Sequence, residues 1–335
     1  MSKKFLMSAC VLAMSAFLGA CGAANGADAN EKKPEYIMNL GDAQADDHPH
    51  SIAERWFAER VSELTDGRVQ VNVYTNSTLG NQPDLIEGLQ LETVHFAKTM
   101  TTGLSVYTPE IQIFDLPYMF TSPEHLYRVI DGEIGEYYKN EVLAPYNMIG
   151  ICYFYAGARS IYSDKQVTTL ADAKGMKLRV PDSPIFIRFC EAIGASGTPM
   201  PMGDIYTGIQ TGVVDGAENA PMVYYYQKHY EAAKYFNLTE HIITPDIVLM
   251  SKSYFESLPK DIQDAILQAG RELQMKEREL WLAEEGKVLE KLKADGAVFN
   301  EVDKKQFEEA ASVVWDEYSS IVGQDMIDKV KALAD

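Results

Sequence analysis

The 335-residue chain contains few cysteines and few cationic residues. Only four cysteines are present, and two of them lie within the first 21 residues, so the rest of the chain has no disulfide framework. Cys152 and Cys190 remain, and the sequence leaves open whether they pair or stay as buried free thiols. Lys and Arg number 30 against 49 Asp and Glu, which gives a formal charge of −19. This balance argues against nucleic acid or an anionic membrane surface as a partner.

Motifs for group-transfer and redox chemistry are missing as well. The sequence has no phosphate-binding loop, no Gly-x-Gly-x-x-Gly opening a helix, no Gly-x-Ser-x-Gly elbow and no Cys-x-x-Cys pair. His48 and His50 are two residues apart, but no third residue has the spacing of a metal ligand. We therefore expect no cofactor, no metal and no catalytic residue. An enzyme stays open only as an alternative, because scattered acids and histidines can converge in a fold.

Long hydrophobic runs are absent beyond the N-terminus, where one short run has the features of a targeting segment. Two lysines precede apolar residues 5–18, a stretch too short for a spanning helix. The sequence Leu-Gly-Ala-Cys follows at residues 18–21 and matches the lipobox of bacterial lipoproteins. We expect a lipoprotein signal peptide over residues 1–20, a lipid anchor on Cys21 and a flexible tether over residues 21–33. An ordinary cleaved signal is the alternative.

Apolar periodicity in the rest of the chain predicts alternating strands and helices. The predicted strands cover residues 35–40, 68–74, 93–97, 147–155, 176–180, 213–214, 247–250 and 298–299. The predicted helices cover residues 49–64, 82–91, 124–131, 134–143, 184–193, 204–210, 258–293 and 307–321. This order predicts doubly wound α/β lobes. The helix over residues 258–293 would extend roughly 50 Å, enough to reach across two lobes.

Residues 174–219 are the most informative stretch, with a predicted order of strand, helix, helix and strand. Arg179 and Asn219 lie near the carboxyl ends of these strands, where open α/β sheets bind ligands. A guanidinium there can hold a carboxylate through two parallel hydrogen bonds. On spacing alone, a solvated residue on a strand is an equally good interpretation of Arg179.

Three segments give this stretch a family resemblance: KGMKLRVPDSP, GASGTPMPMGDIYTGIQTGVVDGAEN and KHYEAAKYFNLTEH, in this order. The chain resembles the solute-binding proteins of tripartite ATP-independent periplasmic (TRAP) transporters, the DctP family, from about residue 35 to about residue 330. The resemblance implies a binding protein with two doubly wound α/β lobes, joined by a hinge and a long spanning helix. Lobe I would cover residues 34–156 and 245–284, and lobe II residues 157–244 and 285–335.

The resemblance also assigns roles to five residues. It implies that Arg179 holds a ligand carboxylate and that Asn219 hydrogen-bonds beside it. Arg159, in a Gly-x-Arg element at the hinge, would be a second cationic contact, with a hinge ion pair as the alternative. Lys98, after the third predicted strand, and His48, in the loop after the first, are candidates for contacting the rest of the ligand. Their alternatives are solvent exposure and a role at the start of a helix.

Two positions depart from the family pattern. Met100 stands where some members carry a carboxylate, and Met202 where an aromatic residue is frequent. These departures weaken the carry-over of an acidic contact and of a stacking contact. Five tyrosines lie between residues 224 and 235, for which core packing is the default and stacking on a sugar ring is the alternative.

The pieces FAKTM, YAGARSIY and DGAENAP are most similar to the branch whose members bind hexuronates such as D-glucuronate or D-galacturonate. C4-dicarboxylates, sialic acids and other hydroxy acids stay open as ligands. So does a different class of function, a ligand sensor that docks a receptor domain. The resemblance implies an extracytoplasmic protein whose partners are an organic acid and the membrane subunits of a permease, and we expect a monomer.

Overall fold

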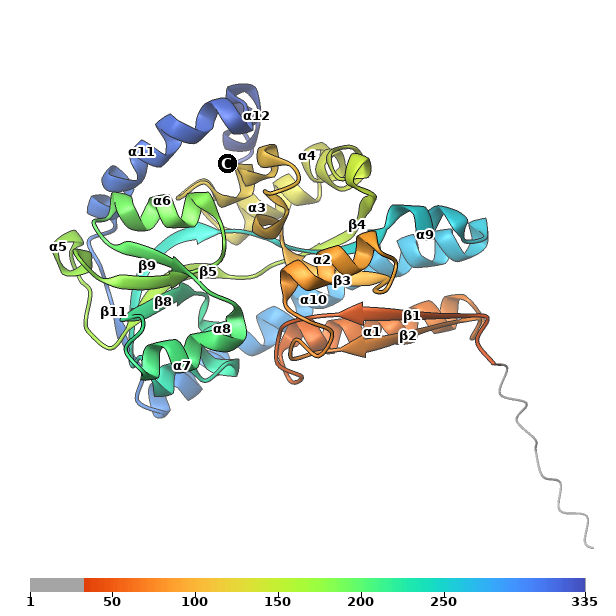
Figure 1. Ribbon diagram of the computed structural model, residues 1–335, viewed down its shortest axis with the longest axis horizontal. Coiled ribbons are helices and arrows are strands. Elements are labelled where there is room, and N and C mark those ends of the chain that lie inside the picture. The colour runs from red at the N-terminus through yellow and green to blue at the C-terminus, as the bar shows by residue number, and fades with distance from the viewer. Residues whose placement is uncertain (1–32, 335) are drawn as a thin grey trace, which may run out of the picture. The chain divides into compact units, whose positions relative to one another are not determined.

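The fold is described by a computed structural model over residues 33–334; the expected signal peptide, Cys21 and most of the tether lie outside the described residues. The structure contains two β-sheets surrounded by helices (Figure 1). The mixed α/β class predicted from the sequence is confirmed. Within residues 33–334, no helix combines the length and apolar character needed to span a membrane.

The first sheet has five strands in the order β2-β1-β3-β10-β4. These strands are β1 (Tyr36–Gly41), β2 (Val69–Tyr74), β3 (Phe96–Met100), β4 (Met148–Phe154) and β10 (Asp246–Ser251). β1 is parallel to β2 and β3, whereas β10 is antiparallel to β3 and β4. The carboxyl ends of β1, β2 and β3 therefore lie along one edge of the sheet.

The second sheet has six strands in the order β11-β9-β5-β8-β6-β7. They are β5 (Ala158–Ser163), β6 (Lys177–Val180), β7 (Ser196–Pro199), β8 (Gly216–Asn219), β9 (Tyr235–Ile243) and β11 (Val298–Asn300). β6 is parallel to β7 and β8, so these three strands also end at a common edge. Two short connections join the sheets: residues 155–157 lead from β4 to β5, and residues 244–245 lead from β9 to β10.

Twelve α-helices and several short 3-10 segments surround the sheets in the described part of the chain. The longer α-helices are α1 (Pro49–Leu64), α2 (Gln82–Gln90), α3 (Pro123–Ile130), α6 (Pro184–Ala192), α10 (Lys260–Ala294), α11 (Lys304–Val322) and α12 (Gln324–Lys331). The shorter ones are α4 (Glu133–Tyr137), α5 (Leu170–Ala173), α7 (Ile205–Gln210), α8 (Pro221–Tyr226) and α9 (Lys252–Ser257). The 3-10 segments η1 (Thr101–Leu104) and η2 (Pro109–Asp115) follow β3, and a π-helical turn, η3 (Tyr138–Val142), follows α4.

The helix α10 connects the two halves of the core. Its first half places Ile266 and Leu273 in the apolar cluster that α1 forms with the first sheet. Its second half places Trp281 and Val288 in another cluster, and α10 contacts α8, which follows the second sheet's strand β8. Each such fully buried side chain contributes roughly 1.5–3 kcal/mol to folding. The predicted long helix is therefore confirmed, and it packs against elements next to both sheets.

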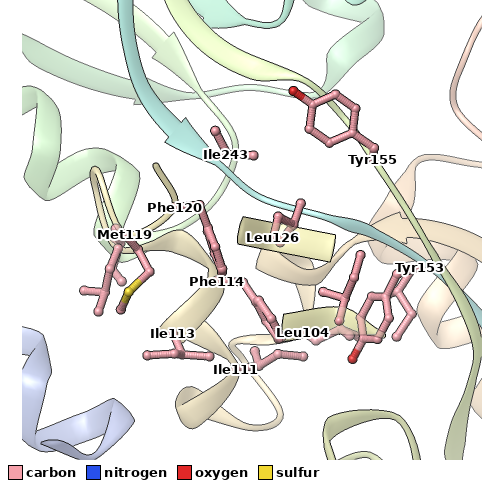
Figure 2. Close-up of a cluster of buried hydrophobic side chains, with 14 of the residues drawn as sticks. Leu104, Ile111, Ile113, Phe114, Met119, Phe120, Leu126, Tyr153, Tyr155 and Ile243 are labelled. Atoms are coloured by element: carbon pink, nitrogen blue, oxygen red, sulfur yellow. The ribbon is translucent and has the colours of Figure 1, made fainter. Parts of the chain in front are cut away.

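The cluster that holds Trp281 and Val288 also fixes the segment that follows β3. Figure 2 shows side chains of η1 and η2, among them Leu104, Ile111 and Phe114, gathered with Tyr153 of β4 and Ile243 of β9. All five are buried. Because they come from segments far apart in the chain, this packing holds η1 and η2 against both connected strands.

Several predicted element positions were wrong. β3 begins at Phe96 and not at residue 93, because the N–H groups of Thr93 and Val94 turn back onto Gly88 O at the end of α2. Glu92 has φ of 56°, which ends α2 in a left-handed turn. The strand predicted at residues 213–214 lies at Gly216–Asn219. The helix predicted over residues 258–293 starts two residues later, at Lys260 after Pro259, and the short helix α9 that ends at Ser257 was not predicted.

The strands β5, β7 and β9 and the helices α5, α8, α9 and α12 were not predicted from the sequence. β9 buries Asn237, Thr239 and His241, and β5 buries Arg159 and Ser160. Polar residues on buried faces break the apolar alternation that marks a strand. Polar side chains of β9 bond to the backbone of the neighbouring strand β5: the Asn237 amide donates to Ile161 O, and Thr239 Oγ1 accepts from the N–H of Ile161.

Candidate functional site

A cavity of about 490 Å³ is lined by residues from both sheets' strand ends. From the first sheet's side it is lined by the start of α2 and the residues that follow β3. From the second sheet's side it is lined by the ends of β6, β7 and β8 and the loops after them. The polar residues at the cavity are Asn81, Gln82, Asp84, Thr102, Tyr107, Arg179, Asp182 and Asn219. Arg179 and Asn219, predicted from the sequence, are thus brought together at one cavity.

Arg179 lies in the second half of β6 and is 5% exposed. Its Nε and Nη2 donate to the backbone carbonyl of Met200 at 2.8 and 2.5 Å. No carboxylate of residues 33–334 lies within ion-pair distance of its guanidinium. Burial lowers the pKa of Arg179 to about 10, which still leaves the group charged at neutral pH. Arg179 is therefore a buried cation without a counter-ion in the described chain, and its Nη1 has no hydrogen-bond partner there.

Asn219 ends β8 and lines the same cavity. Its Oδ1 accepts from the N–H of Ala220 at 2.9 Å and from Nη1 of Arg159 at 3.1 Å. Since the backbone donor fixes which side of the amide is oxygen, the NH₂ group faces the other way. That NH₂ group has no partner among residues 33–334. Arg179 and Asn219 together offer unused N–H donors to a ligand acceptor.

Arg159 forms an ion pair, which was the alternative considered for it. In β5 it is 2% exposed, and its Nε and Nη2 donate to the two carboxylate oxygens of Glu218 at 2.6 and 2.8 Å. His241 Nε2 lies 3.4 Å from the same carboxylate. Burial opposes ionisation of Glu218, but Arg159 outweighs it, and the pKa of Glu218 is below its usual value. Arg159 touches the site through Asn219 and through Met100 Sδ at 3.9 Å; it is not among the residues that line the cavity.

Lys98 does not lie after the third strand, as predicted, but in the middle of β3, opposite Val248 of β10. It is fully buried, and its Nζ lies 2.9 Å from Asp42 Oδ1 and 3.0 Å from Asp246 Oδ2. Burial lowers the pKa of Lys98, but the carboxylates of Asp246 and Asp42 raise it further, so the net shift is upward. Lys98 is not among the residues that line the cavity. The predicted position was wrong because β3 is displaced by three residues.

His48 is buried at the start of α1, where its Nδ1 accepts from the N–H of His50 at 3.2 Å. This is the helix-start role considered as its alternative. Its ring lies 5.3 Å from Tyr226 of α8, centroid to centroid, and its Nε2 has no partner among residues 33–334. Burial lowers the pKa of His48 well below its usual value, so the ring is neutral. His48 does not line the cavity either.

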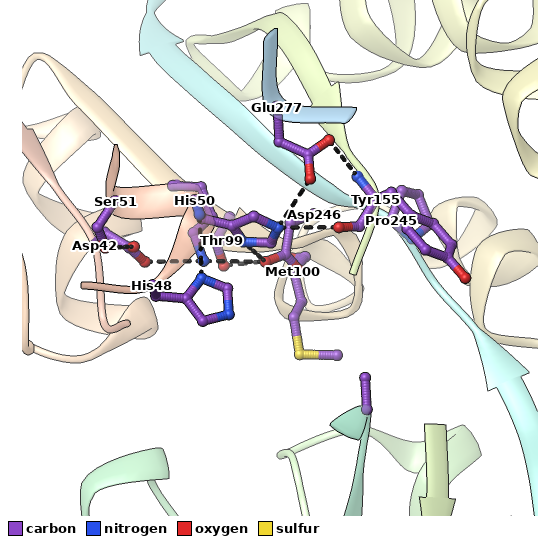
Figure 3. A network of polar contacts seen from close by, with 12 residues as sticks. Asp42, His48, His50, Ser51, Thr99, Met100, Tyr155, Pro245, Asp246 and Glu277 are labelled. Carbon is purple, nitrogen blue, oxygen red and sulfur yellow. Dashed lines mark hydrogen bonds and ion pairs between the residues drawn. The ribbon is translucent and has the colours of Figure 1, made fainter. Parts of the chain in front are cut away.

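His48 belongs to a polar network at the carboxyl end of β1 (Figure 3). His50 Nε2 lies 2.9 Å from Tyr155 O and 3.3 Å from Glu277 of α10. His50 Nδ1 lies 3.6 Å from Asp246. The network joins the loop after β1 to α10 and to the connection between the sheets. No group of three or more His, Cys, Asp or Glu within residues 33–334 is arranged to hold a metal ion.

Several residues that line the cavity were not predicted from the sequence. Gln82 is the clearest: its Oε1 accepts from Thr99 Oγ1 at 3.1 Å and from the N–H of Met100 at 3.4 Å, which leaves its NH₂ group for the cavity. Its place at the first position of α2, after β2, was a usable signal, because that is a carboxyl end of a strand. Met100 and Met202, the two departures from the family pattern, both line the cavity.

The two remaining cysteines are free and buried in the structure. Cys152 lies in β4 and Cys190 in α6. Burial raises the pKa of both thiols. They are therefore unreactive as nucleophiles at neutral pH.

The chain is similar to known solute-binding proteins in sequence and in structure. Residues 40–321 match the family model described as bacterial extracellular solute-binding protein, family 7 (DctP). A solute-binding protein of Chromohalobacter salexigens is 37% identical over 275 residues, which covers 81% of each chain. A TRAP periplasmic solute-binding protein of Pseudomonas putida F1 with bound D-glucuronate has a TM-score of 0.86 and 33% identity, and covers 88% of this chain and 97% of that one.

Two further solved structures show the range of ligands among similar proteins. A TRAP periplasmic solute-binding protein of Sulfitobacter with bound β-D-galacturonate has a TM-score of 0.84 and 33% identity, and covers 89% of this chain and 98% of that one. One of Sulfurospirillum deleyianum with bound succinate has a TM-score of 0.85 and 31% identity, and covers 90% and 99%. With its two sheets, its long connecting helix and a family match over most of its length, the chain belongs to the DctP family of bacterial extracellular solute-binding proteins of TRAP transporters.

Proposed function

We propose that this protein is an extracytoplasmic receptor that captures a hexuronate, such as D-glucuronate or D-galacturonate, and delivers it to the membrane subunits of a TRAP permease. The observation that carries the proposal is the state of Arg179: at the wall of a cavity it is buried and charged, and it has no carboxylate partner in the described part of the chain. A buried charge without a partner costs several kcal/mol, and an anion placed beside it recovers that cost. The ligand carboxylate is the missing counter-ion.

The remaining donors suit a carboxylate beside Arg179. Nη1 of Arg179 and the NH₂ group of Asn219 are both unused, and charge-assisted hydrogen bonds of this kind are short and strong. Arg159 supports the carboxylate indirectly, because it holds the oxygen of Asn219 and so fixes the direction of the NH₂ group. In this proposal Lys98 and His48 do not line the cavity. They support the residues that form its wall on the first sheet's side.

The charges at the cavity favour one carboxylate over two. Arg179 is the single Lys, Arg or His among the described residues that line it, whereas Asp84 and Asp182 are both carboxylates there. A second ligand carboxylate meets these negative groups, whereas hydroxyl groups can donate to them and accept from Gln82. The relatives with bound glucuronate and galacturonate support this choice. The relative with bound succinate makes a C4-dicarboxylate the second candidate.

Transport follows from closure of the two halves on the ligand. The cavity lies between two sheets joined by short connections and by α10, which gives the chain the parts of a hinge. We place lobe I at residues 34–156 and 245–284 and lobe II at residues 157–244 and 285–335. A ligand that binds the closed form better shifts the population toward it, and the closed surface is what the permease recognises. The protein performs no catalysis in this proposal, and a lipid on Cys21 keeps it at the membrane.

The test is a ligand panel measured by thermal shift and calorimetry on the purified protein. The panel contains D-glucuronate, D-galacturonate, D-gluconate, succinate and sialic acid. A ligand at about 100 times its Kd stabilises the folded protein by about 2.7 kcal/mol, and we expect this shift with the two uronates. Arg179→Met should weaken uronate binding about 100-fold or more, because loss of the partner of a buried charge costs about 2–5 kcal/mol.

Arg188→Met is the matched control, since Arg188 lies on the neighbouring helix α6 and pairs with Glu317 at the surface. It should bind uronates like the wild type. A shift with succinate alone would replace the uronate by a dicarboxylate and keep the receptor. No shift with any acid of the panel, or unchanged binding in Arg179→Met, would contradict the proposed site.

A further inference from the structure

A buried carboxyl outside the arginine pair joins the cavity wall to the connection between the sheets. Asp115, the last residue of η2, is fully buried. Its Oδ1 accepts from Thr102 Oγ1 at 2.7 Å and from Thr244 Oγ1 at 3.0 Å. Its Oδ2 is buried and has no partner among residues 33–334. One carboxylate oxygen thus holds two hydroxyl groups that come from different parts of the chain.

The two hydroxyl groups belong to the parts that ligand binding has to coordinate. Thr102 lies in η1 and lines the cavity together with Gly103. Thr244 lies in the two-residue connection from β9 of the second sheet to β10 of the first. Thr101 completes the cluster: its Oγ1 lies 3.1 Å from Thr244 Oγ1, and its N–H donates to Pro245 O at 3.2 Å. The cavity wall is therefore hydrogen-bonded to the connection through Asp115 and its threonine partners.

Asp115 has a fixed position in this cluster, because the residues around it are packed. Phe114 and Leu116 on either side of it are buried in the apolar cluster of Figure 2, which also holds Ile243, next to Thr244. Three residues after Asp115, the N–H of Tyr118 donates to His241 O of β9 at 2.8 Å. A change in the backbone angle at residues 244–245 therefore acts on Asp115. It either moves η1 and the cavity wall together with Asp115 or breaks the hydrogen bonds between Asp115 and the threonines.

We propose that Asp115 is a positioning residue for the ligand site, which sets the place of the Thr102–Gly103 wall relative to the connection that bends when the sheets close. This inference rests on the proposed function, since it needs a ligand whose affinity reports the closed arrangement. Bistable elements of this kind turn a small change at a connection into a change of affinity. Asp115 acts through Thr102 and Thr244 and does not itself touch the cavity.

The charge state of Asp115 provides a second readout. Burial raises its pKa to about 7, the two threonine hydroxyls and Arg159 lower it, and Glu218, which pairs with Arg159 and His241, raises it. An anion bound near the arginines opposes their positive field at Asp115, so the liganded protein binds the Asp115 proton more tightly than the free protein. Binding then takes up protons, and by linkage the affinity falls as the pH rises through about 7.

The experiment is calorimetric titration of the full protein with D-glucuronate, whose carboxylate is ionised from pH 5.5 to 8.5. Thr244→Val removes one donor to Asp115 without changing a residue that lines the cavity, and should raise Kd about tenfold. Thr65→Val is the matched control, because Thr65 is an equally buried threonine whose hydroxyl donates to Val61 O at 2.8 Å at the end of α1. It should lower Tm to a similar extent and leave Kd unchanged.

Asp115→Asn keeps an acceptor for both threonines and should bind nearly as tightly as wild type, with a Kd that no longer changes with pH around 7.

The outcomes separate this inference from the proposed function. If wild type binds glucuronate but Thr244→Val leaves Kd unchanged, Asp115 is structural only and the inference is wrong. If Asp115→Asn keeps the wild-type pH dependence, Asp115 is not the group that titrates with binding, which also overturns the inference. If the wild type binds no acid of the panel, the proposed function fails first, and this inference fails with it. If it binds succinate alone, the same titrations with succinate decide.

Discussion

The first sheet and the second sheet each bury a cation near the cavity, and they treat it differently. Lys98 in β3 lies between Asp42 and Asp246, with both carboxylates about 3 Å away. Arg179 in β6 is almost as buried, has a backbone carbonyl as its acceptor, and contacts no carboxylate of residues 33–334 as an ion pair. In the second sheet the acid that could have paired with it, Glu218, is taken by Arg159.

This contrast shows where the chain leaves room for an external anion. A buried cation whose charge is balanced by the chain is part of the framework, and a new anion gains little from it. A buried cation that the chain leaves unbalanced has its largest gain from a ligand. The same type of observation, a buried positive charge, therefore predicts a structural role in the first sheet and a binding role in the second.

The contrast between Lys98 and Arg179 can be tested by removing each cation in turn in the ligand-free protein. Lys98→Met leaves two buried carboxylates without a cation and should lower the free energy of unfolding by about 3–5 kcal/mol. Arg179→Met removes the cost of a buried charge that lacks a counter-ion, but it also removes the two hydrogen bonds to Met200 O. Because these effects oppose each other, the free energy of unfolding should change by no more than about 1 kcal/mol. Urea unfolding with ligand-free protein measures both values. Equal losses in the two variants would show that Arg179 is as much a part of the framework as Lys98.

The same contrast between apolar and polar burial shows which elements could be predicted from the sequence. The amphipathic helix α1 and the strand β6 could be predicted because their apolar residues recur at the period of the element. β9 and β5 could not, because they bury polar residues that are satisfied only across the sheet, as Asn237 is by Ile161 O. Periodicity detects burial of apolar groups, and these strands are held by polar pairs that are far apart in the chain.

For the cavity, position along a strand was enough to place Arg179 and Asn219 at its wall, since the carboxyl ends of parallel strands converge. It was not enough to separate Arg159 and Lys98 from them. The partner of Arg159 is 59 residues away, at Glu218, and one partner of Lys98 is 148 residues away, at Asp246. Which cation is balanced is a property of the folded arrangement, and no local pattern in the sequence carries it.

The second prediction compares two buried glutamates. Glu277 of α10 is fully buried, accepts from the N–H of Tyr155 at 3.1 Å, and burial raises its pKa to about 8. Between its usual value of 4.5 and about 8, the folded protein keeps a proton that the unfolded chain loses, so this group lowers the stability as pH rises, by up to about 1.4 kcal/mol per pH unit. Glu277→Gln keeps the hydrogen bond without the titration, and its stability relative to wild type should increase from pH 5 to 8.

Glu218 is the matched case in the second sheet. Its pKa is lowered because Arg159 outweighs burial, so it is ionised throughout this range, and its stabilising effect is lost only as the pH falls below 4.5. Glu218→Gln should therefore lower the stability by a constant amount from pH 5 to 8. Urea unfolding of both variants over this range tests the pair. Parallel curves for Glu277→Gln and wild type would show that Glu277 is ionised in the folded protein.

The third prediction sharpens the comparison at the cavity itself, where one unbalanced cation faces two exposed carboxylates. Asp84 and Asp182 lie on opposite sides of the cavity, at the start of α2 and after β6. If they disfavour a second ligand charge, replacing both by Asn should improve binding of D-glucarate, which carries a carboxylate at each end, more than binding of D-glucuronate. Exposed charges are worth about 0.2–1 kcal/mol each, so for the two together we expect a gain of roughly 2- to 30-fold in the ratio of the two Kd values.

Salt provides the control for this small effect. At high ionic strength the exposed carboxylates are screened, so the wild type should approach the double variant in its ratio of Kd values, while Arg179, which is buried, should keep its contribution. Calorimetric titrations at low and high salt give the four ratios needed. If the ratio of the Kd values of D-glucarate and D-glucuronate responds neither to the substitutions nor to salt, the shape of the cavity discriminates between the two ligands. Arg179 would then be the charge that decides binding.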